Sequence, residues 1–268
     1  METTLSEHPY ARLTPDLILR ALESAGFVCD GRLLALNSYE NRVYQIGIED
    51  GPPVIAKFYR PGRWSKQAIL EEHAFSQELA AQEIPVIAPF SDADGGSLHE
   101  LEGFLFAAYP RCGGRWPDLD TKAQRQQMGR FLGRMHAIGA TRHFQHRNRL
   151  DIATLGDASR RFVLEEKLVP DYLFDAYATL SDDLLKQIRV MFEIAGSVAQ
   201  IRLHGDCHKG NILWTDRGPH FVDLDDSCSG PAIQDIWMLL SGETGEMRIQ
   251  FEELLEGYQT FFEFDYSS

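Results

Sequence analysis

The sequence has 268 residues, of which 44% are hydrophobic and 25% are charged, so it is long enough for a globular protein of two lobes. Acidic side chains outnumber basic ones by 40 to 26, which gives a formal net charge of −14 at pH 7. This charge argues against a nucleic-acid or anionic-membrane partner, because an acidic surface repels both polyanions.

The sequence shows no sign of export. The N-terminal stretch METTLSEHPYARL has no apolar core of signal-peptide length, and no run approaches the ~20 apolar residues of a membrane span. The cysteines are scattered without a CxxC pair, which indicates reduced thiols. They are Cys29, Cys112, Cys207 and Cys228. We therefore expect a cytoplasmic protein, and separately we expect a monomer.

The first part of the chain predicts a β-sheet with one main helix. Apolar residues at helical spacing predict a short covering helix over Pro15–Gly26. A longer helix over Ser65–Gln82 has Ser65 as its N-cap and carries Glu72 on its apolar side. Short apolar runs between polar turns predict the strands of an antiparallel sheet. These runs are Leu33–Leu36, Arg42–Ile48, Val54–Tyr59, Val86–Ala88 and Gly103–Tyr109.

The composition changes at the Pro/Gly cluster of residues 110–114, PRCGG, which predicts a hinge between lobes. We expect an N-lobe over residues 1–110 and a C-lobe over residues 111–268. The predicted fold class is α+β, with an antiparallel N-lobe sheet and a mostly helical C-lobe. The helices predicted beyond the hinge are Met128–Ile138, Ala158–Leu168, Leu184–Ala195, Gln234–Leu240 and Arg248–Phe261.

The stretch from Leu203 to Asp226, LHGDCHKGNILWTDRGPHFVDLDD, concentrates residues suited to catalysis. Asp206 follows an apolar strand in a tight turn, so its carboxylate can project from a rigid strand end. A hairpin then returns Asp223 towards Asn211, and their oxygens are hard ligands that suit magnesium carrying phosphates. A carboxylate that is not a ligand, Asp206, can take the proton of an acceptor hydroxyl. The joint pattern predicts a magnesium-dependent phosphoryl-transfer site.

The predicted sheet offers a cation to the same chemistry. Strand alternation places Lys57 and Ile55 on one face, so this surface combines an apolar roof with a cation within reach of a polyphosphate. Glu72 on the following helix is the natural partner of Lys57. No GxGxxG or Walker-type motif is present, so phosphate contacts around Ser38 must come from its hydroxyl and from backbone N–H groups.

Zinc is an alternative reading of the crowded His204, Cys207 and His208. No second ligand pair follows at zinc-finger spacing, which argues against it. We expect His204 and His136 to be packed, hydrogen-bonded core histidines.

Two further carboxylates leave their roles open. Asp235 begins a predicted helix and either complements the helix dipole or braces the Asp206 turn through backbone N–H groups. Asp225 is a possible second metal ligand, although Asp223 is favoured because it directly follows an apolar strand.

At these residues the chain resembles the aminoglycoside-phosphotransferase-like kinases, most closely the stress response kinase A family of bacterial serine/threonine protein kinases. The generic HGDxxxxN pattern with a later apolar-Asp step is specific for the superfamily. The segments that carry the resemblance are LNSYENRVYQ from Leu36, KFYRPGRW from Lys57, ILEEHAF from Ile69, LGRMH from Leu132, LHGDCHKGNILW from Leu203, and FVDLDD followed by GPAIQDIWMLL.

The resemblance implies a bilobal protein-kinase-like fold with ATP in the cleft between lobes, magnesium as cofactor, and a cytoplasmic phosphoprotein of the stress response. It implies Asp206 as the catalytic base, Asn211 and Asp223 as metal ligands, and Lys57 with Glu72 as the phosphate-anchoring pair. The remaining residues expected to contact ATP are Ser38, Ile55 and Tyr109, the last on the strand Phe106–Tyr109 that presents its backbone to adenine.

The expected acceptor is a protein serine or threonine hydroxyl. A small-molecule kinase acting on an aminoglycoside, a sugar or an amino alcohol is the alternative, because the acidic balance suits a cationic acceptor. A non-enzymatic nucleotide-binding module would lack Asp206, Asn211 or Asp223, and all three are present.

The resemblance is less complete at the end of the sequence. Members of the family generally continue past the FFEFD segment with further apolar helices, whereas this sequence ends shortly after it, at Ser268. The C-lobe is therefore expected to be short there and to expose an apolar face.

Overall fold

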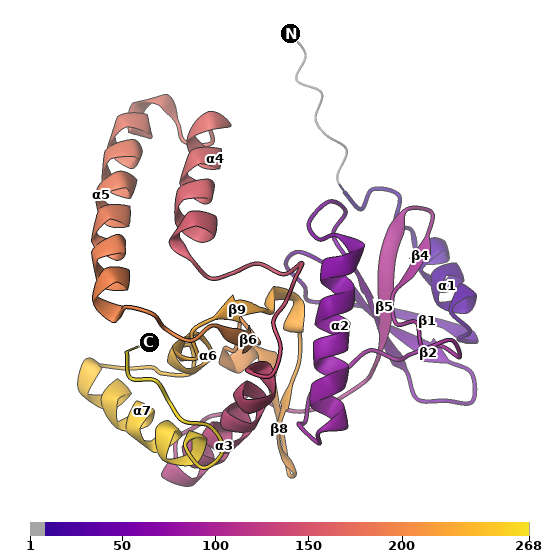
Figure 1. The fold of residues 1–268 in the computed structure, drawn as a ribbon. Coiled ribbons are helices and arrows are strands. Elements are labelled where there is room, and N and C mark those ends of the chain that lie inside the picture. The colour runs from indigo at the N-terminus through magenta and orange to yellow at the C-terminus, as the bar shows by residue number, and fades with distance from the viewer. Residues whose placement is uncertain (1–8, 268) are drawn as a thin grey trace. The chain divides into compact units, whose positions relative to one another are not determined.

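The computed structural model describes residues 9–267, and the chain divides into two compact units (Figure 1). The first unit comprises Met1–Arg115 with Leu213–Asp225, and the second comprises Trp116–Ile212 with Asp226–Ser268. The segment 213–225, expected in the C-lobe, thus groups with the N-terminal part of the chain.

The first unit contains a five-stranded antiparallel sheet with the strand order β1-β2-β3-β5-β4. The strands are β1 (Cys29–Leu36), β2 (Arg42–Ile48), β3 (Val54–Phe58), β4 (His99–Leu101) and β5 (Phe104–Pro110). The short apolar runs predicted β2 and β3 to within a residue.

One predicted strand is wrong. Residues 86–88 are not part of the sheet, and Val86 forms only an isolated parallel bridge with Phe221. Prolines on both sides of this segment, at positions 85 and 89, limit its ladder hydrogen bonds. The fifth strand is β4, which pairs with β5 through a turn whose residues Glu102 and Gly103 have φ of 48° and 83°. Two consecutive positive φ angles are characteristic of tight hairpin turns.

Two helices cover opposite faces of this sheet (Figure 1). Helix α1 (Pro15–Ser24) begins at the N-cap Thr14, and its apolar side packs with Val54, Ala56 and Phe58 of β3. Helix α2 (Lys66–Ala81) begins at the predicted N-cap Ser65 and packs on the other face with Tyr59 and Ala107. Because alternate residues of β3 face α1, Lys57 faces the side of α2.

The hairpin of strands β7 (Ile212–Thr215) and β8 (Gly218–Phe221) is anchored on the segment after α2. The backbone N–H of Phe221 donates to the carbonyl of Pro85 at 2.7 Å, and Ile87 donates back to Phe221 at 2.9 Å. A short 3-10 turn, η3 (Leu224–Asp226), follows the hairpin. These bonds fix the backbone that leads to Asp223.

The second unit is mainly helical. Strand β6 (Ile201–Leu203) pairs antiparallel with β9 (Cys228–Gly230), and a short 3-10 turn, η2 (Lys209–Asn211), follows β6. The helices packed around them are α3 (Lys122–Gly139), α6 (Ile233–Trp237) and α7 (Thr244–Tyr258). The predicted stripe of Met128–Ile138 belongs to α3, which begins earlier because Thr121 and Gln124 form a capping box.

The remaining helices of this unit are η1 (Ile152–Ala158), a π-helical segment, α4 (Ser159–Glu165) and α5 (Asp171–Ala195). The prediction for residues 184–195 covered only the second half of α5, because its first half mixes acidic and apolar residues. The prediction for residues 158–168 covered α4, and the π-helical η1 before it was missed.

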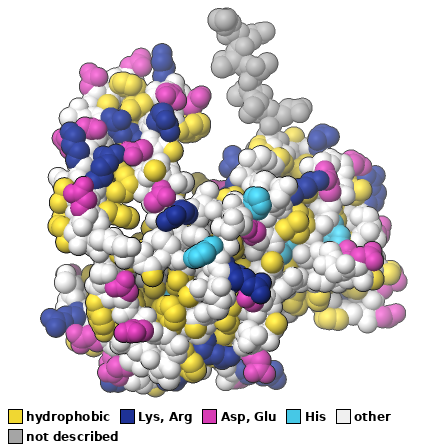
Figure 2. All heavy atoms as spheres, in the orientation of Figure 1, with side chains coloured by type: hydrophobic (Ala, Val, Ile, Leu, Met, Phe, Trp, Pro, Cys, Tyr) yellow, Lys and Arg dark blue, Asp and Glu magenta, His cyan; other side chains and the backbone are white. Residues whose placement is uncertain are grey.

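Helix α5 exposes much of its apolar side. Among the residues of α5, Leu185 alone is buried, and hydrophobic side chains are visible among charged ones on α4 and α5 (Figure 2). The exposed set on α5 is Tyr172, Leu173, Leu180, Leu184, Val190, Met191, Phe192 and Ile194. Within residues 9–267, no helix combines the length and hydropathy required to cross a membrane.

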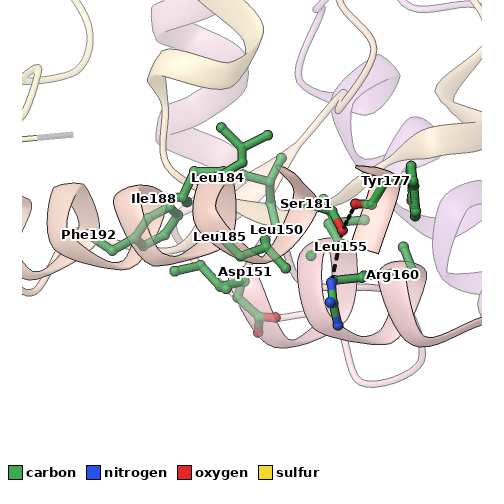
Figure 3. Close-up of a pocket in the computed structure, with 13 residues that line it drawn as sticks. Leu150, Asp151, Leu155, Arg160, Tyr177, Ser181, Leu184, Leu185, Ile188 and Phe192 are labelled. Atoms are coloured by element: carbon green, nitrogen blue, oxygen red, sulfur yellow. Dashed lines mark hydrogen bonds between the residues drawn. The ribbon is translucent and has the colours of Figure 1, made fainter. Parts of the chain in front are cut away.

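A pocket of about 390 Å³ lies between α5 and the η1–α4 segment (Figure 3). Its lining is largely apolar, and Arg160 donates to the hydroxyl of Ser181 at 2.9 Å on one side of it. None of the predicted site residues lines this pocket.

Helices α3 and α7 approach each other through glycine. A Cβ on Gly129 would lie 1.9 Å from the carbonyl oxygen of Leu254, and one on Gly257 would lie 2.0 Å from that of Gln126. Such distances to backbone atoms require the helices to separate.

We expect Gly129→Ala to lower the free energy of unfolding by about 3 kcal/mol in a urea titration. Gly245→Ala in α7 is the control, because its Cβ meets open space; an equal loss in both variants would contradict the packing argument.

Candidate active site

Lys57 on β3 is surrounded by carboxylates of the first unit. Its side chain is 7% exposed, and Nζ lies 2.8 Å from Asp223, 3.2 Å from Asp225 and 3.6 Å from Glu72. Burial by itself lowers the pKa of Lys57, but the three carboxylates outweigh it and raise this pKa well above its ordinary value. The ammonium therefore stays charged, and the predicted contact between Lys57 and Glu72 is present.

The two carboxylates after β8 differ in exposure. The Asp223 side chain is 53% exposed and its backbone φ is 59°, a left-handed value that few residues other than glycine adopt. The Asp225 side chain is 5% exposed, and its oxygens face Lys57 and Arg63. Asp223 thus presents an oxygen to solvent while Asp225 is held in buried ion pairs, which favours Asp223 as the metal ligand.

A buried hydroxyl–imidazole network that the sequence analysis missed supports Lys57. The Tyr59 ring lies 5.1 Å from Lys57 Nζ. The Tyr59 hydroxyl lies 2.7 Å from His73 Nε2 and 2.9 Å from the Tyr109 hydroxyl, and His73 Nδ1 lies 2.9 Å from Ser97 Oγ. Burial raises the pKa of Tyr59 and Tyr109, so both keep the protons that these bonds need. Two local clues to this network were present in the sequence. Tyr59 lies two residues after Lys57, on the same face of the strand, and His73 directly follows Glu72 on the helix.

The other residues predicted to contact ATP also lie in the first unit. The Ser38 hydroxyl donates to the carbonyl of Asn41 at 2.9 Å, so it stabilises its own loop. Ile55 is half-buried and pairs with Tyr109 of β5. The side chain of Tyr109 belongs to the buried network, and its backbone lies in the ladder with β3, so the adenine contact of this strand stays a prediction.

Asp206 and Asn211 lie together in the second unit. Gly205 turns the chain after β6 with φ of 86°, where a Cβ would lie 2.1 Å from the carbonyl oxygen of Asp226. The Asn211 amide donates to Asp206 Oδ2 at 2.9 Å and to its backbone carbonyl at 3.0 Å. In the part of the chain that the structure describes, the amide oxygen of Asn211 has no hydrogen bond and can serve as a ligand. The predicted approach of Asp223 to Asn211 concerns two separate units and stays a prediction.

His208 also faces Asp206. Its Nδ1 accepts from the backbone N–H of Gly210 at 2.9 Å, and its Nε2 lies 3.4 Å from Asp206 Oδ2. Because Nδ1 accepts, the neutral imidazole carries its proton on Nε2, which points at the carboxylate. Cys207 is buried, which raises the pKa of its thiol well above the ordinary value and leaves it a poor thiolate ligand for zinc.

Asp235 braces the turn that carries Asp206. Its carboxylate accepts from the backbone N–H groups of His204 at 2.8 Å and Gly205 at 2.9 Å. It also lies 3.1 Å from His136 Nε2, and His136 Nδ1 lies 2.8 Å from the Tyr258 hydroxyl. This confirms the bracing role among the two alternatives for Asp235, and it confirms His136 as a buried, hydrogen-bonded histidine. Burial opposes ionisation of Asp235, but the bonds from His136 and Gly205 outweigh it and lower its pKa.

We expect Asp235→Asn to lower the free energy of unfolding by about 3 kcal/mol near neutral pH, because an amide cannot accept on both sides. The stabilisation belongs to the ionised carboxylate, whose folded-state pKa lies below its ordinary 3.8. The difference from wild type should therefore be constant above about pH 5 and shrink as the pH falls towards about 3. Urea titrations across this range measure it, with the exposed Asp175→Asn as control. A difference that grows on acidification would contradict the assignment.

Sequence comparisons identify relatives over nearly the whole chain. The model of the phosphotransferase enzyme family (APH) matches residues 32–268. Stress response kinase A of Escherichia coli is 44% identical over 260 residues, which cover 97% of this chain and 78% of that protein. Serine/threonine protein kinase RdoA of Salmonella typhimurium is 43% identical over 256 residues, which cover 96% of this chain and 77% of that protein.

Solved structures share the fold at lower identity. Amicoumacin kinase hAmiN, in complex with AMP-PNP, Ca²⁺ and Ami, matches with a TM-score of 0.74 and 22% identity, covering 92% of this chain and 78% of its own. A microcompartment-associated aminopropanol kinase matches with a TM-score of 0.68 and 18% identity, covering 93% and 82%. The chain thus has the protein-kinase-like α+β fold, belongs to the phosphotransferase enzyme family, and is an ATP-dependent kinase.

Proposed function

We propose that this kinase transfers the γ-phosphate of ATP to serine or threonine hydroxyls of proteins, with magnesium as its metal. The observation that carries the assignment is the buried Lys57 ammonium, held beside the exposed Asp223 and paired with Glu72. The acceptor class is supported by the names of relatives at 43% and 44% identity.

The donor set fits magnesium. The proposed ligands are the Asp223 carboxylate and the Asn211 amide, and both are hard oxygen donors of the kind that magnesium prefers. A divalent metal bound with nucleotide in the amicoumacin kinase complex supports the same requirement. When bound, magnesium neutralises phosphate charge and orients the transferred group.

Lys57 supplies the cation for the phosphates. Glu72 and Asp225 hold its ammonium in place within the buried surroundings, so that little reorganisation is needed when a phosphate oxygen arrives. Ser38 and its loop backbone contribute further phosphate contacts, Ile55 covers the base, and the backbone near Tyr109 bonds adenine.

Asp206 acts as the base. The amide of Asn211 and the imidazole of His208 both approach Asp206 Oδ2, which leaves Oδ1 to accept the proton of the acceptor hydroxyl. The brace from Asp235 to the preceding backbone fixes where this carboxylate projects.

A small-molecule acceptor is the second candidate. The net charge of −14 favours a cationic acceptor, and the aminopropanol kinase with the same fold acts on an amino alcohol by its name. Both candidates use the same nucleotide and base residues, so only the acceptor distinguishes them.

We expect Asp206→Asn to reduce phosphoryl transfer by about 1,000-fold or more, because the base is removed. Binding of magnesium AMP-PNP should change by no more than about twofold, since transfer rather than affinity depends on this carboxylate. Transfer is measured with labelled ATP and binding by calorimetry. Turnover close to wild type would exclude Asp206 as the base.

The acceptor is tested with the same pair of proteins. Wild type and Asp206→Asn are incubated with labelled ATP and magnesium in a cell extract, and label is followed in proteins and in low-mass compounds. Serine or threonine phosphorylation that depends on Asp206 supports the protein acceptor. Label that appears only in hydroxyl-bearing small molecules would decide for the alternative.

A further inference from the structure

The turn that follows β3 presents an arginine to the Lys57 cluster, defined as Lys57, Glu72, Asp223 and Asp225. The backbone N–H of Arg63 donates to the carbonyl of Arg60 at 3.2 Å, and Gly62 has φ of 80°. Proline at the second position and a glycine with positive φ at the third are the residues that a type II turn requires. The Pro61-Gly62 pair thus fixes the backbone position from which the Arg63 side chain extends.

The Arg63 guanidinium reaches two carboxylates from distant parts of the sequence. Its Nη1 forms an ion pair with Glu40, and its Nη2 lies 3.8 Å from Asp225 Oδ2. The Arg63 side chain is 20% exposed and the Asp225 side chain 5%, so water screens this bridge only partly. The other oxygen of Asp225 lies 3.2 Å from Lys57 Nζ. Glu40 is therefore joined through Arg63 and Asp225 to the Lys57 cluster.

Glu40 belongs to the loop of residues 37–41 that contains Ser38. Tyr39 at its tip is 97% exposed, so packing does little to hold this part of the loop. The Asn41 side chain accepts from the backbone N–H of Arg60 at 3.1 Å, and the Tyr10 hydroxyl donates to the carbonyl of Glu40 at 2.9 Å. These bonds fasten the backbone at the end of the loop, whereas the Glu40 side chain connects it to the charges around Lys57.

We propose that Arg63 is a positioning residue for the nucleotide, which holds the Ser38 loop against the Lys57 cluster by bridging Glu40 to Asp225. This inference rests on the proposed roles of Ser38 and Lys57 in binding ATP. The planar guanidinium suits the bridge because its two terminal nitrogens can serve two carboxylates at once, which a single ammonium does poorly. Arg63 and Lys57 both contact Asp225. The arginine therefore weakens the attraction of Asp225 for Lys57, which leaves the ammonium close to Glu72 and Asp223.

The bridge predicts a separation of kinetic constants. We expect Arg63→Gln to raise the KM for ATP about tenfold, the size expected when a bond between charged groups is lost, and to leave kcat within about twofold. Arg63→Lys should resemble Arg63→Gln rather than wild type. Arg60→Gln removes the same charge from the same turn and is the matched control, because the Arg60 side chain has no hydrogen bond or ion pair within residues 9–267. A lower kcat with unchanged KM, or equal effects in Arg60→Gln, would overturn the proposal.

Two further measurements keep the bridge separate from folding and from the nucleotide assignment. Hydrogen exchange of the amides of residues 37–41 in the nucleotide-free protein should accelerate in Arg63→Gln and in Glu40→Gln, but not in Arg60→Gln. The double variant Glu40→Gln with Arg63→Gln should match Arg63→Gln alone in the KM for ATP, because both changes break one bridge.

Independent, additive effects of Glu40 and Arg63 would overturn the bridge even if ATP binding is confirmed. Wild-type protein that fails to bind magnesium AMP-PNP would instead contradict the proposed function. In that case hydrogen exchange alone tests the bridge. If the amides of residues 37–41 exchange in Arg63→Gln at the rate seen in Arg60→Gln, the proposed bridge is wrong; faster exchange supports it.

Discussion

The buried ammonium of Lys57 is the charge on which the first unit depends. A desolvated cation is stable only when carboxylates surround it, and here those carboxylates come from α2 and from the segment after β8. The sheet, the helix and the hairpin must therefore be correctly assembled before Lys57 can be buried. The same requirement positions Asp223, whose unusual backbone angle comes two residues after the bonds that anchor Phe221.

The second unit uses a buried charge of the opposite sign in a similar way. Asp235 is fully enclosed, and its two oxygens are satisfied by the backbone of the Asp206 turn and by His136. In both units the supporting groups are buried, while Asp206 and Asp223 keep part of their carboxylates exposed. The carboxylate oxygens of Asp206 and Asp223 that are proposed to act on the substrates are therefore accessible, while the buried groups beside them hold them in place.

Local patterns in the sequence predicted much of this arrangement. A short apolar run located β3, and period-two alternation indicated the face of Lys57. The N-cap Ser65 located the start of α2, and the helical spacing of Glu72 placed it towards Lys57. The order of residues around Asp206 also indicated that Asp235 could brace the turn. Most of these inferences depend on a single element or on two adjacent ones, whereas the brace from Asp235 spans 30 or 31 positions.

The features that were missed depend on contacts between segments distant in the sequence. The network of Tyr59, His73 and Tyr109 joins three elements, and the local clues at Tyr59 and His73 do not show that these side chains meet one another and Tyr109. The bridge from Glu40 to Asp225 spans 185 positions and is visible only once Arg63 is placed between them. Strand β4 was missed for a local reason, since its three residues carry little apolar alternation and depend on the adjoining tight turn.

The central claim is that the Lys57 ammonium is held against the Asp223 carboxylate that is proposed to bind the metal ion, so that the two cations compete for this carboxylate. Manganese binding to the nucleotide-free protein, followed by electron paramagnetic resonance, tests this claim most directly in Lys57→Met, after circular dichroism has shown that the variant is folded. Removing a cation 2.8 Å from the Asp223 carboxylate should tighten manganese binding, by about tenfold, while phosphoryl transfer is lost. Manganese affinity that is unchanged or weaker in Lys57→Met would contradict the account.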